Sequence, residues 1–232
     1  MISKYIFIVG TGRCGTRWLN EWILKHSRCF GGPESHFFIK ASKMLESWPG
    51  SGPIPWLNNS ESTMIRLIRN FAGDFYSHRM IHPKDCLVDC TPDQYDHRNF
   101  IKQVFPHAKF VHIYRDGKYF VWSVTRSTWG KKITIKNWSL RWVKLMEDMA
   151  NSRNDQVNIK YEDLLENPHL SKKITEFAEI SHHGDIIPWV SPINTKNSYY
   201  DPDKWKALSD SEKEDMKIMN NQLINNGYSP VV

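Results

Sequence analysis

A glycine-rich stretch at residues 9–19, VGTGRCGTRWL, lies between an apolar, strand-like run and a helix-like segment. Such a turn exposes several backbone N–H groups and directs the positive end of the helix dipole at its ligand, and both features favour phosphate. Magnesium-dependent nucleotide kinases use the pattern GxxxxGK[ST] at this place. Gly10 and Gly15 have that spacing, but Thr16 replaces the lysine and Arg17 replaces the hydroxyl residue that holds magnesium. The stretch therefore predicts either a phosphate site without magnesium or a strand–helix turn without a ligand.

A second stretch, YRDGKYFVWS at residues 114–123, places an arginine where a strand gives way to a helix. Arg115 follows the strand-like run Phe110–Tyr114, and Ser123 lies eight residues further along, in the helical pattern. In open α/β sheets, ligands bind at the carboxyl ends of the parallel strands. Arg115 is therefore either a ligand-binding residue or an ordinary surface residue.

Short apolar segments alternate with longer helical patterns along the chain. The predicted strands are Tyr5–Val9, Cys86–Asp89, Phe110–Tyr114 and Val157–Tyr161. Strands that alternate with helices indicate a parallel sheet covered by helices. The sheet would bring the two stretches above to one edge, because parallel strands all end there.

The helical segments carry apolar stripes, which we expect to pack in the core. These stripes are Leu19, Trp22 and Ile23 in the helix Thr16–His26; Met64, Ile65, Ile68, Phe71, Ala72 and Phe75 in residues 61–77; and Trp138, Trp142, Leu145 and Met149 in residues 136–150. A further stripe near the C-terminus consists of Met216, Met219 and Leu223. Ser209 and Glu212 predict a capping box at the start of that segment, and Gly227 predicts its end.

The composition is that of a globular protein, since 40% of the 232 residues are hydrophobic and 13% are aromatic. The formal net charge of +6 favours an anionic ligand, but no basic run exceeds two residues, so nucleic acid is not an expected partner. No signal peptide or transmembrane run is evident, so we expect a cytoplasmic protein without membrane insertion. The cysteines lack CxxC spacing and are expected to be free and buried, with no metal site; they are Cys14, Cys29, Cys86 and Cys90.

Together these stretches resemble the sulfotransferase family, which uses 3′-phosphoadenosine 5′-phosphosulfate (PAPS) as its donor. GTGRCGTRW, residues 10–18, is similar to the family's 5′-phosphosulfate loop, and YRDGKYFVWS is similar to its 3′-phosphate motif. IKYEDLLENP, residues 159–168, resembles the later segment whose tyrosine lies near the adenine. DKWKALS, residues 203–209, followed by a helix and Asn226–Tyr228, resembles the closing segment. The order of the four motifs implies a P-loop-type three-layer α/β fold, with a central parallel sheet flanked by helices.

The resemblance also implies roles in donor binding. Arg13 takes the place of a family lysine or arginine beside the bridging oxygen, where negative charge builds as the sulfuryl group departs. Thr16 and backbone amides would hold the 5′-phosphate, and Arg17 is either a further phosphate ligand or a surface residue. Trp18 either flanks the adenine or packs in the core. The other implied donor contacts are the backbone of Cys14 and Gly15, Arg115 and Ser123 at the 3′-phosphate, Tyr161 near the adenine, and late in the chain Lys204, Lys196, Asn197 and Ser198.

Transfer to a hydroxyl requires a group that takes the acceptor proton. GGPESHFF, residues 31–38, follows the first helix, as does the segment with the catalytic glutamate in the tyrosylprotein and glycan branches of the family. Glu34 is therefore the expected catalytic base, and His36 is the competing candidate. A solvated turn in which neither has a role is the alternative, and residues 89–93 are the next place to look for a base.

One position departs from the family pattern. LVDCTPDQY, residues 87–95, is similar to a segment that often carries a catalytic lysine two residues before the proline, and Cys90 holds that place here. Either Arg13 supplies all the positive charge, or another cation such as Lys84 substitutes, or activity is weakened.

The sequence thus predicts a single sulfotransferase domain over residues 1–232, in which residues 40–80 form a helical insertion on the acceptor side. Its donor would be PAPS, without a metal, and its acceptor a hydroxyl of a glycan, peptide or small metabolite. The alternatives are a P-loop kinase of the same fold, which would need ATP and magnesium, and a non-catalytic nucleotide-binding protein, which Cys90 keeps open.

Overall fold

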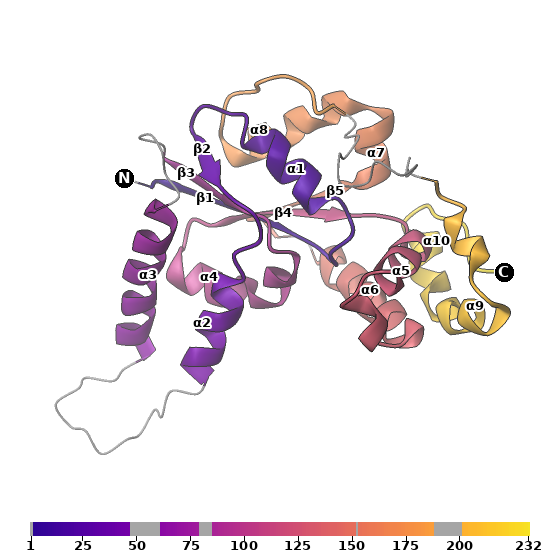
Figure 1. Ribbon diagram of the computed structural model, residues 1–232. Coiled ribbons are helices and arrows are strands. Elements are labelled where there is room, and N and C mark those ends of the chain that lie inside the picture. Colours follow the sequence, from indigo (N-terminus) through magenta and orange to yellow (C-terminus); the bar gives the residue numbers. More distant parts are fainter. Residues whose placement is uncertain (1, 47–60, 79–84, 152, 188–200) are drawn as a thin grey trace, which may run out of the picture.

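The computed structural model describes residues 2–46, 61–78, 85–151, 153–187 and 201–232. Within these residues, five strands form one parallel sheet in the order β2-β3-β1-β4-β5 (Figure 1). The strands are β1 (Lys4–Val9), β2 (Cys29–Gly31), β3 (Cys86–Asp89), β4 (Lys109–Tyr114) and β5 (Gln156–Lys160). Because β1 lies in the middle of the sheet, the loop that follows it is central on the carboxyl edge.

The described residues outside the sheet are mostly helical. The α-helices are α1 (Thr16–Ile23), α2 (Phe37–Glu46), α3 (Glu61–Ser77), α4 (Arg98–Val104), α5 (Gly117–Thr125), α6 (Ile135–Ala150), α7 (Tyr161–Glu166), α8 (Ser171–Ala178), α9 (Asp210–Met216) and α10 (Asn220–Asn225). The short 3₁₀ helices are η1 (Pro92–His97), η2 (Gly130–Lys132), η3 (Pro168–Leu170), η5 (Lys204–Ala207) and η6 (Lys217–Met219).

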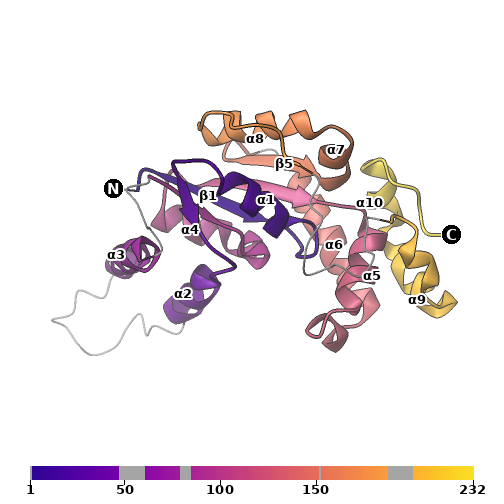
Figure 2. The same cartoon turned by 45° about the horizontal axis from the view of Figure 1, so that its top comes forward.

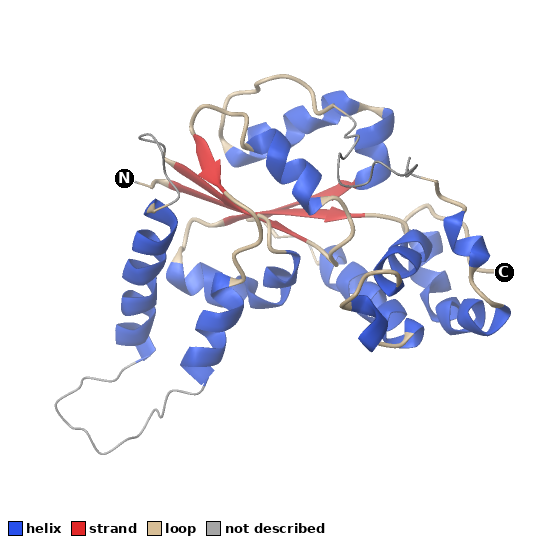
Figure 3. Ribbon diagram, viewed as in Figure 1, coloured by secondary structure: helices blue, strands red, loops and turns tan. Residues whose placement is uncertain are grey.

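The helices cover both faces of the sheet (Figures 1, 2 and 3). Strand β1 shows why, because its side chains alternate between two apolar clusters. Ile6 and Ile8 pack with α1, α7 and α8, whereas Phe7 and Val9 pack with α2, α3 and α4. Burying a side chain of this size contributes about 1.5–3 kcal/mol relative to exposure, so both layers hold the central strand. This arrangement confirms the predicted three-layer α/β fold.

A third apolar cluster joins α5 and α6 to the C-terminal helices. Trp142 of α6 is fully buried there, and the ring leaves so little room that a Cβ on Gly117 would come within 2.8 Å of it. The expected stripe of Met216, Met219 and Leu223 is buried in the same cluster. The capping box of Ser209 and Glu212 and the left-handed Gly227 are present as predicted.

Four predicted strands are confirmed to within one residue at each end, but two element boundaries were wrong. Tyr161 begins α7 instead of ending β5. The first helix ends at Ile23 and not at His26, because its chain tightens there into bonds between residues three apart, as in Lys25 N–H to the Trp22 carbonyl. Strand β2 was not predicted.

Helix α3 has the predicted bounds, but its buried face is shifted from the predicted one. The buried residues are Met64, Ile68, Ala72 and Tyr76, at a spacing of four. Phe71 was expected in the core and is instead 61% exposed. Tyr76 is buried because its hydroxyl bonds to groups at the carboxyl edge of the sheet.

All four cysteines are free and buried, as predicted. In the part of the chain that the structure describes, no cluster of three or more His, Cys, Asp or Glu side chains could hold a metal ion. No helix in that part is long and apolar enough to cross a membrane. Of the expected helical insertion over residues 40–80, residues 47–60 and 79–80 lie outside the described residues.

Candidate active site

The loop between β1 and α1 has the backbone of an anion-binding turn. Gly12, Arg13 and Gly15 have positive φ angles of 76°, 51° and 101°. Gly15 caps α1 without a side-chain hydrogen bond, and the first turn of the helix holds no acidic residue. The first amides of the helix thus have no side-chain cap and no competing carboxylate, so the loop fits a phosphate group.

Close packing explains the glycines of this loop. A Cβ on Gly10 would lie 2.5 Å from the Ile113 carbonyl oxygen and 2.7 Å from Cys14 Sγ. A Cβ on Gly15 would lie 2.7 Å from the ring of Tyr161. The Cys14 side chain is fully buried, and burial raises the pKa of its thiol. Only the backbone of Cys14 is therefore suited to a ligand.

Two arginines meet on the β4 side of the loop. Arg13 Nε donates to Ser123 Oγ at 3.1 Å, and Arg115 Nη1 donates to the Arg13 carbonyl oxygen at 2.9 Å. Burial, followed by the charge of Arg115, lowers the pKa of Arg13. Two guanidinium groups so placed repel each other, and an anion between them would relieve the repulsion. The structure therefore brings together the three residues expected at the donor phosphates.

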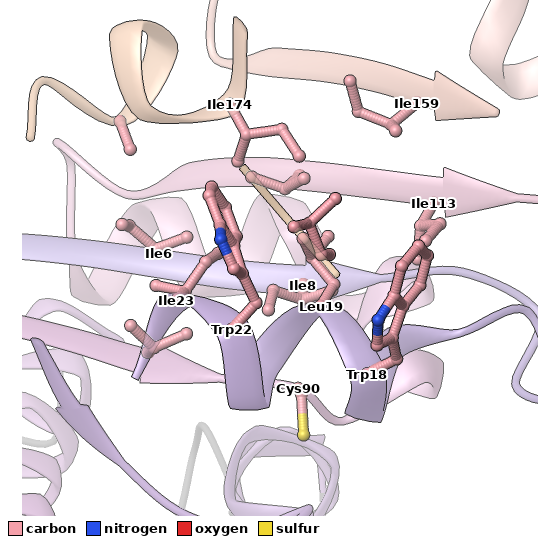
Figure 4. Close-up of a cluster of buried hydrophobic side chains, with 14 of the residues drawn as sticks. Ile6, Ile8, Trp18, Leu19, Trp22, Ile23, Cys90, Ile113, Ile159 and Ile174 are labelled. Carbon is pink, nitrogen blue, oxygen red and sulfur yellow. The ribbon is translucent and has the colours of Figure 1, made fainter. Parts of the chain in front are cut away.

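Aromatic rings flank Arg115 of this cluster. The Arg115 guanidinium lies 3.8 Å from the ring centroid of Tyr119 and 4.5 Å from that of Tyr161. Trp18 meets Tyr161 edge to face at 5.2 Å and donates from Nε1 to the Ile187 carbonyl oxygen at 2.9 Å. Trp18 is also a buried member of the α1 cluster (Figure 4). Its packing in the core is therefore shown, and contact with an adenine stays a prediction.

Glu34 and His36 lie on the opposite side of the loop, between β2 and α2. Glu34 Oε2 is 3.6 Å from His36 Nε2, and both side chains are partly exposed. His36 has a positive φ of 52°, an uncommon conformation for a residue with a side chain. Both candidate bases are thus present on one turn.

The buried Asp89 at the end of β3 holds this turn. Its Oδ1 accepts hydrogen bonds from the backbone N–H of Thr91 at 2.9 Å and from the Thr91 hydroxyl at 2.7 Å. Its Oδ2 accepts from the hydroxyl of Ser35 and from that of Tyr76 at 2.7 Å. Thr91 Oγ1 in turn accepts from the His36 N–H at 3.2 Å. Asp89 thus fixes the residues that flank Glu34 and is itself enclosed, so it is unsuited to taking an acceptor proton.

Sequence reasoning gave no role to Ser35 or Tyr76, and it named Asp89 and Thr91 only within residues 89–93, as a further place to look for a base. Asp89 stands at the end of a predicted strand, which was a usable signal. Tyr76 lies in α3, far along the chain, and nothing in the sequence connects it to the turn.

Cys90 is buried next to this turn. Burial, together with the negative charges of Asp89 and Glu34, raises the pKa of its thiol to about 12, and the charge of Arg17 opposes this shift. Cys90 is thus a neutral thiol at neutral pH and cannot supply the charge of the lysine expected there.

Of the residues expected to contact the donor late in the chain, the structure describes Lys204. Its Nζ lies 5.5 Å from the ring centroid of Trp122, which precedes Ser123 on α5. Lys84, Lys196, Asn197 and Ser198 lie outside the described residues.

Comparisons with known proteins identify the family of this chain. A model of the sulfotransferase family matches residues 5–184. Protein-tyrosine sulfotransferase A of Caenorhabditis elegans is 24% identical over 209 residues, which cover 80% of this chain and 54% of the relative. Protein-tyrosine sulfotransferase 2 of Gallus gallus is 24% identical over 206 residues, 78% of this chain and 54% of the relative. The chain spans about half the length of these curated relatives.

Solved structures show the same fold. The sulfotransferase domain of the Synechococcus olefin synthase superposes with a TM-score of 0.60 at 16% identity, over 96% of this chain and 95% of that one. The sulfotransferase domain of the curacin biosynthetic pathway gives a TM-score of 0.61 at 17% identity, over 99% of both chains. Since the family model covers well over half of the chain, the chain belongs to the sulfotransferase family.

Proposed function

We propose that the chain transfers a sulfuryl group from PAPS to an acceptor hydroxyl. The observation that carries the proposal is the cluster of Arg13, Arg115 and Ser123 beside the uncapped first turn of α1. Two anion sites next to each other match a donor with a 5′-phosphosulfate and a 3′-phosphate. Arginine suits the 3′-phosphate because its planar fork can make paired, charge-assisted hydrogen bonds. A mononucleotide with phosphates only at its 5′ end would leave the anion site at Arg115 and Ser123 empty.

In this proposal the backbone of residues 13–16 holds the 5′-phosphate, with Thr16 as a side-chain ligand. Arg115 and Ser123 bind the 3′-phosphate, and Arg13, which lies between the two sites, stabilises the phosphate that leaves. The donor supplies the sulfuryl group. Tyr161, which packs on Gly15 and under Arg115, contacts the adenine.

Glu34 is the proposed general base. Its carboxylate is partly exposed, stands on the edge of the sheet beside the loop, and is held by the Asp89 network through Ser35. His36, whose Nε2 lies 3.6 Å from Glu34 Oε2, is the competing base. Arg17 substitutes for the hydroxyl residue of magnesium-dependent loops, which supports sulfuryl transfer without metal over a kinase reaction.

We further propose that the chain forms a single sulfotransferase domain and works on glycan, peptide or small-metabolite hydroxyls. Helices α2 and α3, which include most of residues 40–80, flank the side of the sheet on which Glu34 lies (Figure 1). That position supports their assignment to the acceptor side. The proposed location, the cytoplasm, rests on sequence alone.

One observation favours a second candidate, a nucleotide-binding protein without activity: the neutral Cys90 leaves the acceptor side without the expected lysine. Tight donor binding without turnover on any acceptor would support that candidate.

The test begins with the donor product 3′-phosphoadenosine 5′-phosphate (PAP). PAP should raise the melting temperature without added metal, because a ligand that binds only the folded state stabilises it by mass action. Calorimetry then gives its affinity, and labelled PAPS serves for an acceptor screen. No thermal shift at millimolar PAP, or a shift only with ATP and magnesium, would exclude the proposed function.

A further inference from the structure

Arg17 occupies an unusual place for an arginine. It lies in the first turn of α1, one residue after Thr16, and its side chain is exposed. Among the described residues it makes no hydrogen bond or ion pair. A cation next to the positive end of a helix dipole is locally unfavourable, so packing and local structure do not explain it.

Two contacts of neighbouring residues show which way Arg17 faces. Asn20 Nδ2 of α1 donates to the Gly32 carbonyl oxygen at 3.4 Å, and Cys90 Sγ lies 3.9 Å from the same oxygen. Arg17 precedes Asn20 by three residues, so it lies on the same side of α1, about 4.5 Å closer to the loop. Figure 4 shows Cys90 next to this helix. Arg17 is therefore on the side of Cys90 and of Glu34, two residues after Gly32.

The charges agree with this geometry. The positive charge of Arg17 lowers the pKa of Cys90 while the negative charge of Glu34 raises it. The charge of Arg17 also lowers the pKa of Arg13, after the larger effects of burial, Arg115 and Tyr119. Arg17 is thus close enough to interact with Arg13 of the loop and with Cys90, the buried thiol that also feels the charge of Glu34.

The two arginines of the loop have different surroundings. Arg13 is hydrogen-bonded to Ser123 and lies close to Arg115, on the side of β4. Arg17 faces the ends of β2 and β3. One arginine is directed at the phosphates of the donor, and the other is directed at the space between the donor and Glu34.

We propose that Arg17 is a catalytic residue that binds the oxygens of the sulfuryl group from the acceptor side during transfer. This inference rests on the proposed function. In the transfer the acceptor oxygen forms a bond to sulfur, and the bond from sulfur to the phosphate oxygen breaks. Its electron pair stays on the phosphate, and the acceptor proton passes to Glu34. Arg17 holds the sulfuryl oxygens in line between the two, and its charge keeps the anionic group and the carboxylate of Glu34 from repelling each other.

The first test compares Arg17→Ala with Lys25→Ala. Lys25 is exposed beyond the other end of α1, so its removal changes the net charge equally. We expect Arg17→Ala to lower kcat by on the order of 10²-fold, as loss of one preorganised charge-stabilising donor does. Lys25→Ala should keep the wild-type kcat. Arg17→Lys should lie between the two, because it keeps the charge and loses the fork.

The second test measures binding without turnover, by calorimetry in the absence of acceptor. A residue that binds the sulfuryl group should matter for PAPS and not for PAP, which lacks that group. Arg17→Ala should weaken PAPS binding by roughly tenfold, the low end of the range for a charge-assisted contact, and leave PAP affinity unchanged. Arg17→Gln is measured beside it as a second variant that retains the length of the side chain.

The outcomes separate this inference from the proposed function. If wild-type protein binds neither PAP nor PAPS, the proposed function fails. If wild-type protein transfers sulfuryl groups and Arg17→Ala keeps kcat within threefold, the inference is overturned. It is also overturned if Arg17→Ala weakens PAP and PAPS equally, because Arg17 would then be a ligand of the 5′-phosphate.

Discussion

Replacing Arg115 with alanine tests the donor site most directly, because this residue should distinguish PAP from a nucleotide without the 3′-phosphate. Arg115 is only 7% exposed, and its guanidinium lies over the rings of Tyr119 and Tyr161. Adenosine 5′-phosphate is the matched ligand, since it differs from PAP by the 3′-phosphate alone. The quantity to compare between wild type and variant is the ratio of the affinity for PAP to the affinity for adenosine 5′-phosphate.

The magnitude has two parts. A charge-assisted hydrogen bond to phosphate contributes about 1.5–3 kcal/mol, so loss of the 3′-phosphate contact weakens PAP roughly ten- to hundredfold. Arg115 also donates to the carbonyl oxygen of Arg13, and losing that ordinary bond costs about 0.5–1.5 kcal/mol. Loss of that second bond deforms the loop, so its cost weakens the binding of both ligands. The PAP preference should therefore fall by roughly ten- to hundredfold, while adenosine 5′-phosphate weakens by less than that.

Calorimetry measures both nucleotides on three proteins: wild type, Arg115→Ala and Arg126→Ala. Arg126 caps the other end of α5 from Arg115 and lies over Trp122, so its loss removes an equal charge at the far end of that helix. Thermal melts without ligand show whether each variant folds. Equal losses for both nucleotides in Arg115→Ala would refute the reasoning, since Arg115 would then be structural or would contact another group. A PAP preference lost equally in Arg126→Ala would point to net charge instead of a specific contact.

Three further changes test the base, the network that holds it and the core. Glu34→Gln should leave PAP affinity nearly unchanged and lower kcat by on the order of 10²–10⁴. His36→Ala should lower kcat much less. If an acceptor assay shows the larger loss of kcat for His36→Ala, His36 is the base. Tyr76→Phe removes a donor from the buried carboxylate of Asp89, so it should lower the free energy of unfolding by about 1–3 kcal/mol in urea titrations and lower kcat without weakening PAP; an unchanged kcat would separate the network from catalysis. Burial, with the charge of Arg98, lowers the pKa of His112 to about 3, below its ordinary 6.5. The unfolded chain therefore binds one more proton than the folded chain as pH falls from 6.5 towards 3. In this range the free energy of unfolding of wild type should fall by about 1.4 kcal/mol per pH unit relative to that of His112→Gln. His112→Gln lacks this histidine, so its free energy of unfolding must lack this part of the pH dependence.

Elements with a long periodic pattern could be predicted from the sequence. Helix α3 was placed at its observed bounds, and α6 differed by one residue. Strand β2 could not be found, because it has three residues, too few for alternation to show. Its register with β3 depends on tertiary contact: a Cβ on Gly31 would lie 2.0 Å from the Val88 carbonyl oxygen.

The residues of the candidate site likewise divide into those that the sequence could predict and those that it could not. Arg13, Arg115 and Ser123 were selected because they stand at fixed distances within two motifs, and the fold brings them into contact. The network under Glu34 could not be selected, because its members come from β3, α3 and the turn before α2. Hydrogen bonds between side chains so distant along the chain leave no periodic signal. Asp89 is the partial exception, as a carboxylate at a strand end.

In the proposed function, the order of the strands divides the carboxyl edge of the sheet into a donor half and an acceptor half. Arg115 follows β4 and Tyr161 follows β5, on one side of the central loop after β1; Glu34 follows β2 and Asp89 ends β3, on the other side. Because all five strands are parallel, these groups stand along one edge, on either side of the loop that we propose holds the phosphosulfate. A donor held from β5 to β1 and an acceptor held from β2 to β1 give the in-line arrangement that transfer requires. Substitutions on the β4–β5 half should therefore change donor affinity, and those on the β2–β3 half should change kcat at saturating donor. A substitution on the β4–β5 half that changes only kcat, or one on the β2–β3 half that changes only donor affinity, would contradict this division of the site.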